Sequence, residues 1–328
     1  MEIAVIGGGS WATALVKILS EKDVKVKWWL RNRESVNYIK KFGHNPNYLS
    51  DIQINLKKVK PDINLVKVLE NTSVVILAVP SAFLKPVLHE IPQHALKGKT
   101  VVSAIKGMVP ADNCLITDYI HRKFDVPLEK LCIIAGPCHS EEIAMERYSY
   151  LTLGCENENQ AKEIAELLRC RFVKTQAATD LYGIEYSAIM KNIVAVAAGI
   201  ANGLHYGDNF RAVLISNAMQ EIKRFLDTVY PFDRDINHSA YLGDVLVTAF
   251  SQFSRNRTFG NMIGRGYSVK SAQMEMNMVA EGYYAVQSIN EINKKWKVDM
   301  PIAHAVYNIL YEKISPAVEF EILKAKLN

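Results

Sequence analysis

Lys191 lies in the most apolar helical segment of the sequence. Apolar residues recur at helical spacing over residues 186–204, and the stretch 190–199 is apolar almost all round, which predicts a buried helix. Burial lowers the pKa of a lysine because it disfavours the charged form, and a lysine titrating near neutrality can transfer a proton. We therefore interpret Lys191 as a candidate acid–base residue. The alternative is a structural ion pair, for which Asp244 is the candidate carboxylate.

Residues 254–257 read Ser-Arg-Asn-Arg and so combine a hydroxyl, an amide and two guanidiniums. Arginine can bind two phosphate oxygens at once, and serine and asparagine add further hydrogen bonds. Ser254, Arg255 and Asn256 are therefore candidate phosphate-binding residues, and a basic surface turn is the alternative. Three glycines follow within residues 260–266 and predict a mobile loop over the site.

The N-terminal residues 7–12 read GGGSWA and match the pattern GxGxxG/A. The motif follows a strand-like run and precedes a helical pattern, which is the context that dinucleotide binding requires. Gly7 would permit the tight turn, Gly9 would let the backbone approach a pyrophosphate, and Ala12 would allow close packing of helix on strand. The alternative is a glycine-rich turn without a ligand.

The residues after the second strand bear on the choice of cofactor. Arg31, Asn32 and Arg33 stand there, and the first acidic residue is Glu34. An acid would bind the ribose 2′-hydroxyl of NAD, whereas guanidiniums suit the 2′-phosphate of NADP. We predict NADPH as the cofactor; NADH, or use of both, is the alternative. The alternative is that both arginines are solvated loop residues.

Two further strand-end turns carry polar residues. Lys106 follows the run 100–105, where it could meet an anion or a carbonyl oxygen; a surface lysine is the alternative. Gly136, Cys138 and His139 follow the run 131–135, and the small residues there would let a ligand approach the backbone. We disfavour a thiol nucleophile or a metal at this turn and expect no metal site, because the other histidines show no ligand spacing.

The sequence pattern predicts two domains of different fold class to position these residues. Short runs rich in Val and Ile predict strands at 3–6, 24–30, 74–79, 100–105, 131–135, 148–153 and 171–173. Their alternation with helices predicts an α/β fold with an N-terminal doubly wound, Rossmann-type sheet over residues 1–178. Helical periodicity predicts an all-α domain over residues 179–328, with a cleft between the domains.

Composition narrows the class of protein. The chain has 328 residues, a net charge of +5 and five cysteines without CxxC spacing, which favours a reduced, cytoplasmic protein. No apolar run reaches the roughly 20 residues of a membrane span, and no secretion signal is evident. The longest basic cluster, residues 57–60, is expected in a solvated loop, so nucleic-acid binding is not predicted.

Taken in order along the chain, several segments resemble NAD(P)-dependent glycerol-3-phosphate dehydrogenase of the soluble, bacterial type. They are GGGSWATAL, SAIKG, AGPCHSEE, MKNIVAVAAGIANGL, GDNFRA, LGDVLVTAFSQFSRNRTFG and VAEG. The resemblance implies an oxidoreductase that interconverts dihydroxyacetone phosphate, a phosphorylated triose, and sn-glycerol 3-phosphate by hydride transfer with NAD(P)H. It also implies a role in phospholipid biosynthesis. For the assembly of the protein, the hypothesis is a homodimer.

The resemblance also implies site roles. Lys191 would transfer the proton, Asp244 would orient it and Lys106 would stabilise charge on oxygen. Implied cofactor contacts are Gly7, Gly9, Ser10, Trp11, Arg31, Lys106, Ser140, Arg255, Val279 and Glu281. Implied substrate contacts are Lys106, Gly136, Cys138, Lys191, Asp244, Ser254, Arg255 and Asn256.

The sequence departs from the family pattern at four positions. Cys138 stands where Ser or Thr is usual, and a thiol is a poorer hydrogen-bond donor, which puts that contact in doubt. His139 replaces an aromatic residue, Ala12 a common Gly, and Tyr241 a small residue. Two other functions stay open on the sequence. One is a related dehydrogenase acting on a phosphate-free hydroxy acid, and the other is a nucleotide sensor without catalysis.

Overall fold

The computed structural model describes residues 1–110, 112–276 and 280–328. The chain divides into two compact units. The first unit comprises residues 1–105 and 116–181, and the second comprises residues 106–115 and 182–328. The sequence had placed residues 106–115 in the first domain because they follow a strand. In the structure this short segment packs with the helical residues instead, and it carries Lys106 into the second unit.

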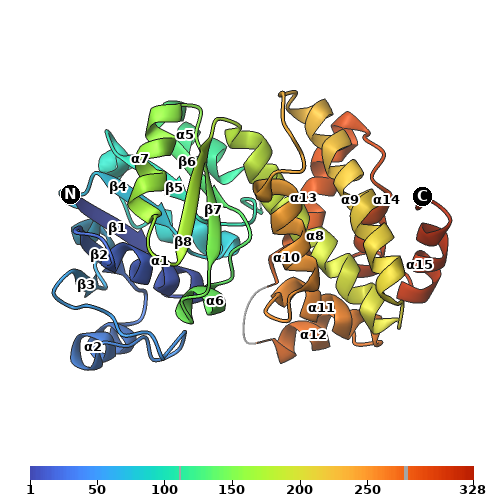
Figure 1. The fold of residues 1–328 in the computed structure, drawn as a ribbon, viewed down its shortest axis with the longest axis horizontal. Helices are drawn as coiled ribbons and strands as arrows, with labels where there is room; N and C mark the ends of the chain where they lie inside the picture. The colour runs from blue at the N-terminus through green and yellow to red at the C-terminus, as the bar shows by residue number, and fades with distance from the viewer. Residues whose placement is uncertain (111, 277–279) are drawn as a thin grey trace. The chain divides into compact units, whose positions relative to one another are not determined.

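The first unit contains one eight-stranded sheet (Figure 1). Its strands are β1 Glu2–Ile6, β2 Lys25–Trp29, β3 Val59–Asp62, β4 Val74–Leu77, β5 Thr100–Ser103, β6 Leu131–Ala135, β7 Ser149–Gly154 and β8 Val173–Ala178. The order across the sheet is β3-β2-β1-β4-β5-β6-β7-β8, and neighbours are parallel except that β7 runs antiparallel to β6. The first six strands have the Rossmann order, so the predicted fold class is confirmed.

The edge strand β3 was missed by the sequence analysis. It contains Pro61 and alternates buried with more exposed residues, so it lacks the continuous apolar run of a central strand. The prediction of a solvated loop at residues 57–60 was wrong for its last two residues, because Val59 and Lys60 pair with Val26 and Lys27 of β2. The last strand was also misplaced, since β8 begins at Val173, where the predicted strand ended.

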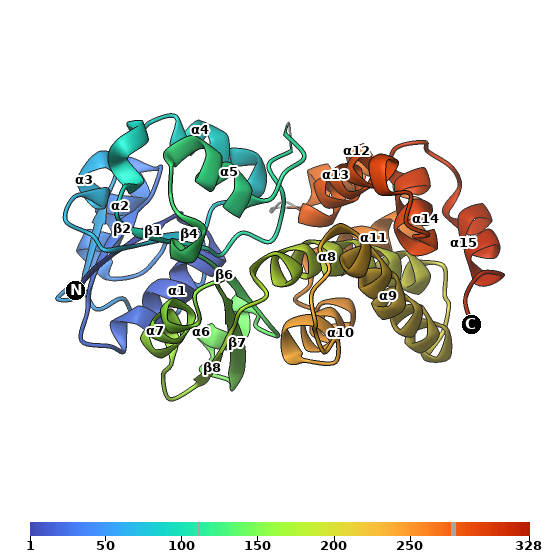
Figure 2. The ribbon, with the colours of Figure 1, turned by 90° about the horizontal axis from the view of Figure 1, so that it is seen from above.

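Helices cover both faces of this sheet (Figure 2). They are α1 Ser10–Ser20, α2 Arg33–Phe42, α3 Leu65–Leu69, α4 Leu84–Leu88, α5 Ile116–Phe124, α6 Ser140–Ala144 and α7 Glu158–Leu168. In Figure 2, α1 and α7 lie on one side, and α3, α4 and α5 lie on the other. The buried faces of α1 and α7 form one apolar core with the strands, which fixes the position of the glycine-rich turn between β1 and α1.

The second unit is helical, as predicted. Its helices are α8 Leu181–Gly203, α9 Asp208–Val229, α10 Asp244–Phe250, α11 Arg255–Gly264, α12 Val269–Glu275, α13 Glu281–Trp296, α14 Pro301–Leu310 and α15 Pro316–Lys324. Ser268 caps α12, and Pro301 and Pro316 are the first residues of α14 and α15. Gly207 occupies the N-cap position of α9.

Helices α8 and α11 pack backbone against backbone. A Cβ atom added at Gly199 would lie 2.1 Å from the Arg257 carbonyl oxygen, and one at Gly260 would lie 2.1 Å from the Val196 carbonyl oxygen. A Cβ atom at Gly264 would lie 2.4 Å from the Ile200 carbonyl oxygen of α8. The prediction of a mobile loop at residues 260–266 was therefore wrong, because two of its three glycines belong to α11 and allow this close crossing.

Helix α8 is long and apolar enough to cross a membrane by length and composition. However, 94% of its most apolar window is buried inside the protein. Such burial is typical of the central helix of a folded unit, which is the role that its nearly uniform apolar surface predicted.

Candidate active site

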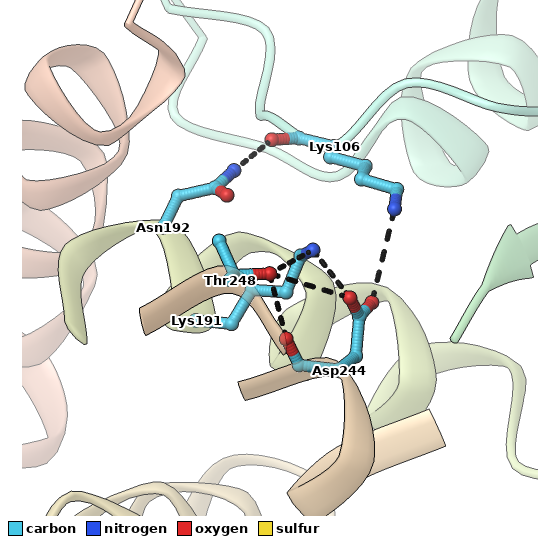
Figure 3. A network of polar contacts seen from close by, with 5 residues as sticks. All are labelled: Lys106, Lys191, Asn192, Asp244 and Thr248. Carbon is cyan, nitrogen blue, oxygen red and sulfur yellow. Dashed lines mark hydrogen bonds and ion pairs between the residues drawn. The ribbon is translucent and has the colours of Figure 1, made fainter. Parts of the chain in front are cut away.

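Lys191 lies on the buried face of α8 and forms a short polar network with α10 (Figure 3). Its Nζ donates to Oδ1 of Asp244 at 2.5 Å and to Oγ1 of Thr248 at 2.8 Å. Thr248 in turn donates to the backbone carbonyl of Asp244 at 2.6 Å. The side chains of Lys191 and Asp244 are only 5% and 1% exposed. Lys191 and the carboxylate that the sequence offered as its partner are therefore in direct contact.

Burial dominates the electrostatics of Lys191. Removal from water lowers its pKa from 10.5 to about 8, although the Asp244 carboxylate opposes this change. The positive charge of Lys106 acts in the same direction as burial and contributes to this lowered pKa. The result is an amine that titrates close to neutrality, as proton transfer requires.

Lys106 joins the same network from the segment that follows β5. Its Nζ lies 3.8 Å from Oδ2 of Asp244, and its backbone carbonyl accepts a 2.8 Å hydrogen bond from Nδ2 of Asn192 (Figure 3). Asn192 is the residue after Lys191, so the same turn of α8 carries Lys191 and binds the backbone carbonyl of Lys106. The sequence analysis missed Asn192 and Thr248. Helical spacing offered a signal only for Thr248, which is four residues after Asp244.

Ser254 and Asn256, at the start of α11, each accept a hydrogen bond from a backbone N–H group. Ser254 is the N-cap of α11, and its side chain accepts from the backbone N–H of Arg257 at 3.3 Å. Oδ1 of Asn256 accepts from the backbone N–H of Gly282 at 2.8 Å, which ties α11 to the start of α13. Both side chains are buried, and the contacts fix where Arg255 emerges from α11.

The expected cofactor residues of the second unit lie near the start of α13. Glu281 is its first residue and is partly exposed. Val279 lies outside the described residues.

The glycine-rich turn has the geometry that a dinucleotide needs. Gly7 has a φ angle of +138°, and a Cβ atom there would lie 2.3 Å from the Ala78 carbonyl oxygen. At Gly9, by contrast, a Cβ atom would meet nothing within 4 Å. Gly7 is thus required by the fold, whereas Gly9 leaves open space beside the N-terminus of α1. This cradle fits a pyrophosphate, because the first N–H groups of a helix have no acceptor within the helix.

Other predicted cofactor residues surround this turn. Ser10 is the buried first residue of α1, and Trp11 is half-buried against the core of the sheet. Arg31 is exposed after β2, and its guanidinium lies 5.8 Å from the ring centre of Phe83. Phe83 is 44% exposed and ends a short 3-10 helix; the sequence analysis missed it, because a lone aromatic residue has no distinctive pattern.

The turn after β6 holds the remaining residues. Gly136 has a φ angle of +109°, and a Cβ atom there would lie 2.8 Å from the Tyr150 carbonyl oxygen. Cys138 is buried, and Ser140 begins α6. Within the described residues, no group of three or more His, Cys, Asp or Glu side chains is arranged to hold a metal ion.

A Rossmann sheet with this glycine turn, followed by a helical unit that buries a lysine against a carboxylate, defines a nicotinamide-dependent dehydrogenase of the two-domain type. Comparison with known proteins narrows the class. Residues 2–161 match the family model of the NAD-dependent glycerol-3-phosphate dehydrogenase N-terminus, and residues 180–321 match the model of its C-terminus. The chain belongs to the NAD-dependent glycerol-3-phosphate dehydrogenase family.

Individual relatives agree with this assignment. The chain is 33% identical to a glycerol-3-phosphate dehydrogenase [NAD(P)+] of Clostridium botulinum, covering 98% of this chain and 96% of that one. It is 34% identical to a protein of the same name from Exiguobacterium, covering 98% and 94%. The solved glycerol-3-phosphate dehydrogenase of Coxiella burnetii superposes with a TM-score of 0.90 at 27% identity, covering 98% of both chains.

Proposed function

We propose that this chain interconverts dihydroxyacetone phosphate and sn-glycerol 3-phosphate by hydride transfer with NAD(P)H. The observation that carries the proposal is the buried contact between Lys191, Asp244 and Thr248, in a chain whose two halves both match the glycerol-3-phosphate dehydrogenase family. A protein that only sensed a nucleotide would have no use for a buried lysine whose pKa is lowered to about 8.

Cofactor binding is assigned to the first unit, with contributions from the second. The N-terminus of α1 and the open space at Gly9 support a pyrophosphate site. Arg31 suits a 2′-phosphate and Phe83 offers a face for the adenine, which favours NADPH while permitting NADH. When bound, NAD(P)H supplies the hydride. Ser10, Trp11, Lys106, Ser140, Arg255, Val279 and Glu281 are the further contacts that we propose.

Lys191 is the proposed proton donor to the carbonyl oxygen as it becomes an alcohol. An ammonium group has three N–H donors, and two of them are directed to Asp244 and Thr248. The third is available to the substrate oxygen. After it leaves, the neutral amine still has two N–H groups for its two protein partners, so the lysine keeps its orientation. Lys106, whose charge lies beside Asp244, is assigned to stabilise the developing negative charge on the substrate oxygen.

The substrate phosphate is assigned to Arg255 and Asn256 at the start of α11, with Ser254. Arginine can grip two phosphate oxygens, and holding the phosphate positions the carbonyl for reaction. The N–H groups of the first turn of α11 add to the attraction of an anion. Gly136 and Cys138 are assigned as further substrate contacts, and the thiol makes a weaker hydrogen bond than a hydroxyl would.

Substrate-dependent oxidation of NADPH and NADH by the purified protein tests the proposed function. We expect turnover with dihydroxyacetone phosphate and at most a trace with dihydroxyacetone, because only the former offers a phosphate. Equal turnover with the two ketones, or turnover only with phosphate-free 2-keto acids, would overturn the assignment of the substrate. No turnover with any carbonyl compound, despite NADPH binding, would favour a sensor.

The proposed domain roles, setting and assembly follow from the same assignment. Residues 1–178 would bind mainly the cofactor, and residues 179–328 would supply the proton donor and the phosphate site. The product sn-glycerol 3-phosphate is the backbone of glycerophospholipids, so we assign the chain to phospholipid biosynthesis in the cytoplasm.

We also propose that the protein is a homodimer. Sedimentation of the purified protein tests this proposal, because a homodimer has twice the 36.9 kDa mass of the chain.

A further inference from the structure

The backbone carbonyls of the glycine triplet 7–9 are each held by a buried side chain. The donors are Trp28 Nε1 to the Gly7 oxygen at 2.7 Å, Asn45 Nδ2 to the Gly8 oxygen at 3.0 Å and Thr13 Oγ1 to the Gly9 oxygen at 3.0 Å. Asn45 Nδ2 also donates to Thr13 Oγ1 at 2.8 Å, so two of the three holders are linked to each other. All three side chains are at most 1% exposed.

Holding a carbonyl also fixes the direction of the next N–H group. In a trans peptide unit the C=O and the N–H that follows it point in opposite directions. Each of the carbonyls of residues 7–9 is drawn toward a buried donor, so each of the N–H groups of Gly8, Gly9 and Ser10 is directed away from the donor of the carbonyl before it. Gly9 leaves open space at this turn, beside the first N–H groups of α1.

Asn45 reaches the triplet from a segment without regular secondary structure, between α2 and β3. Gly43 ends α2 with a φ angle of +74°, and its carbonyl accepts from the backbone N–H of Ile54 at 2.7 Å. Ile52 and Ile54 are buried in the core of the first unit and anchor the far end of the segment. The segment is therefore folded back as a closed loop that places the Asn45 amide beneath the glycine turn.

We propose that Asn45 is a positioning residue for cofactor binding: it locks Gly8 and Thr13 so that the N–H groups of Gly8, Gly9 and Ser10 face the cofactor pyrophosphate. This inference rests on the proposed use of NAD(P)H. Asn45 would strengthen binding through preorganisation, because a loop that is already oriented loses less conformational freedom when the cofactor binds. The Asn45 side chain acts through the backbone and does not itself contact the reacting atoms.

The variant Asn45→Leu tests this role. Leucine has a similar volume and no charge, so electrostatic repulsion of the pyrophosphate cannot explain an effect. We expect the Kd and the KM for NADPH to rise about tenfold, because the Gly8 carbonyl loses its buried donor and the turn is no longer held. The KM for dihydroxyacetone phosphate and the kcat at saturating NADPH should change by less than about twofold.

Asn47→Ala is the matched control. Asn47 is an exposed residue of the same segment, and its side chain contacts Ser35 instead of the glycine turn. Its backbone N–H, which donates to Oδ1 of Asn45 at 3.1 Å, is unaffected by the substitution. We expect this variant to bind NADPH as the parent does. An equal loss of NADPH affinity in Asn47→Ala would mean that the segment acts only through its general stability, and would overturn the proposal.

A second pair of variants decides the question if Asn45→Leu does not fold. Thr13→Val removes the hydroxyl that accepts from Asn45 Nδ2 and adds to the backbone N–H bond on the Gly9 carbonyl, and Thr13→Ser restores this hydroxyl. We expect weaker NADPH binding in the valine variant and recovery in the serine variant. Unchanged NADPH affinity in folded Asn45→Leu, or in Thr13→Val, contradicts the proposal. Because NADPH binding is measured without substrate, this result is separate from a failure of the wild-type protein to turn over dihydroxyacetone phosphate.

Discussion

Gly7 and Gly9 belong to one turn but meet different constraints. At Gly7 a side chain would collide with the Ala78 carbonyl, and the φ angle of +138° is one that other residues rarely adopt. At Gly9 a side chain would enter open space. We therefore expect Gly7→Ala to lower the free energy of unfolding by about 2 kcal/mol or more. Gly9→Ala should fold normally but bind NADPH more weakly, since its methyl group occupies the place of the pyrophosphate.

Denaturant unfolding and NADPH titration of both variants separate the two roles. The expected pattern is a loss of stability in Gly7→Ala and a loss of affinity alone in Gly9→Ala. If Gly9→Ala bound NADPH with unchanged affinity, the pyrophosphate would not approach the turn where we place it.

The lowered pKa of Lys191 predicts a pH dependence of opposite sign in the two directions of the reaction. Reduction needs the protonated lysine, so kcat/KM for dihydroxyacetone phosphate should fall as the pH rises through about 8. Oxidation of sn-glycerol 3-phosphate needs the neutral amine, so its kcat/KM should rise over the same range. Asp244 raises the pKa of Lys191, and its replacement by Asn should therefore move both transitions to lower pH. Profiles that are flat between pH 7 and 9 would contradict this role.

At the scale of elements, the crossing of α8 and α11 brings the helix with the phosphate-binding candidates against the helix that carries the proposed proton donor. The glycines 199, 203, 260 and 264 let the two helices approach closely. Their spacing of four residues was visible in the sequence, but glycine alone is also a signal for a turn. The choice between loop and helix crossing depends on a partner more than 50 residues away, and local patterns do not contain that information.

Glu221 links α9 to α14 and predicts a pH-dependent stability. Its carboxylate is buried and accepts from the backbone N–H groups of Ile302 and Ala303 at 2.8 and 2.9 Å. Burial raises its pKa from 4.5 to about 7, although these hydrogen bonds oppose the change. A group whose pKa is higher in the folded state favours folding when protonated. The free energy of unfolding should thus fall as the pH rises from 4.5 to 7.

Glu221→Gln removes this titration. The difference in unfolding free energy between the parent and the variant should change with pH over that window, by on the order of 3 kcal/mol at most. Urea unfolding at pH 5 and pH 7 measures it. A constant difference between the two proteins would show that Glu221 keeps an ordinary pKa in the fold.

For the whole molecule, the sequence predicted the fold class, the central strands and the contact of Lys191 with Asp244. These predictions rested on patterns with strong local signals: apolar runs, helical periodicity and a glycine motif in its expected place. Residues 106–115 could not be assigned by such patterns, because their packing with the helical unit depends on contacts such as that of Asn192 with the Lys106 carbonyl. Phe83 and Asn45 were missed for the same reason.

The net charge of +5 did not identify a ligand, but the placement of one charge makes a prediction about the cofactor. Arg31 lies exposed beside the Phe83 ring, where it can meet a 2′-phosphate. Arg31→Ala should lower kcat/KM for NADPH about tenfold more than kcat/KM for NADH, because only NADPH carries that phosphate. Equal losses with the two cofactors would place the 2′-phosphate elsewhere.

The central claim is that Lys191 transfers the proton in the reduction of dihydroxyacetone phosphate. The most direct measurement is turnover by Lys191→Met beside its affinity for NADPH, since methionine fills the same buried space without a proton to give. We predict that kcat falls by at least about a thousandfold while the Kd for NADPH stays within about threefold of the parent. A folded Lys191→Met protein that reduces dihydroxyacetone phosphate at the parental rate would contradict the account.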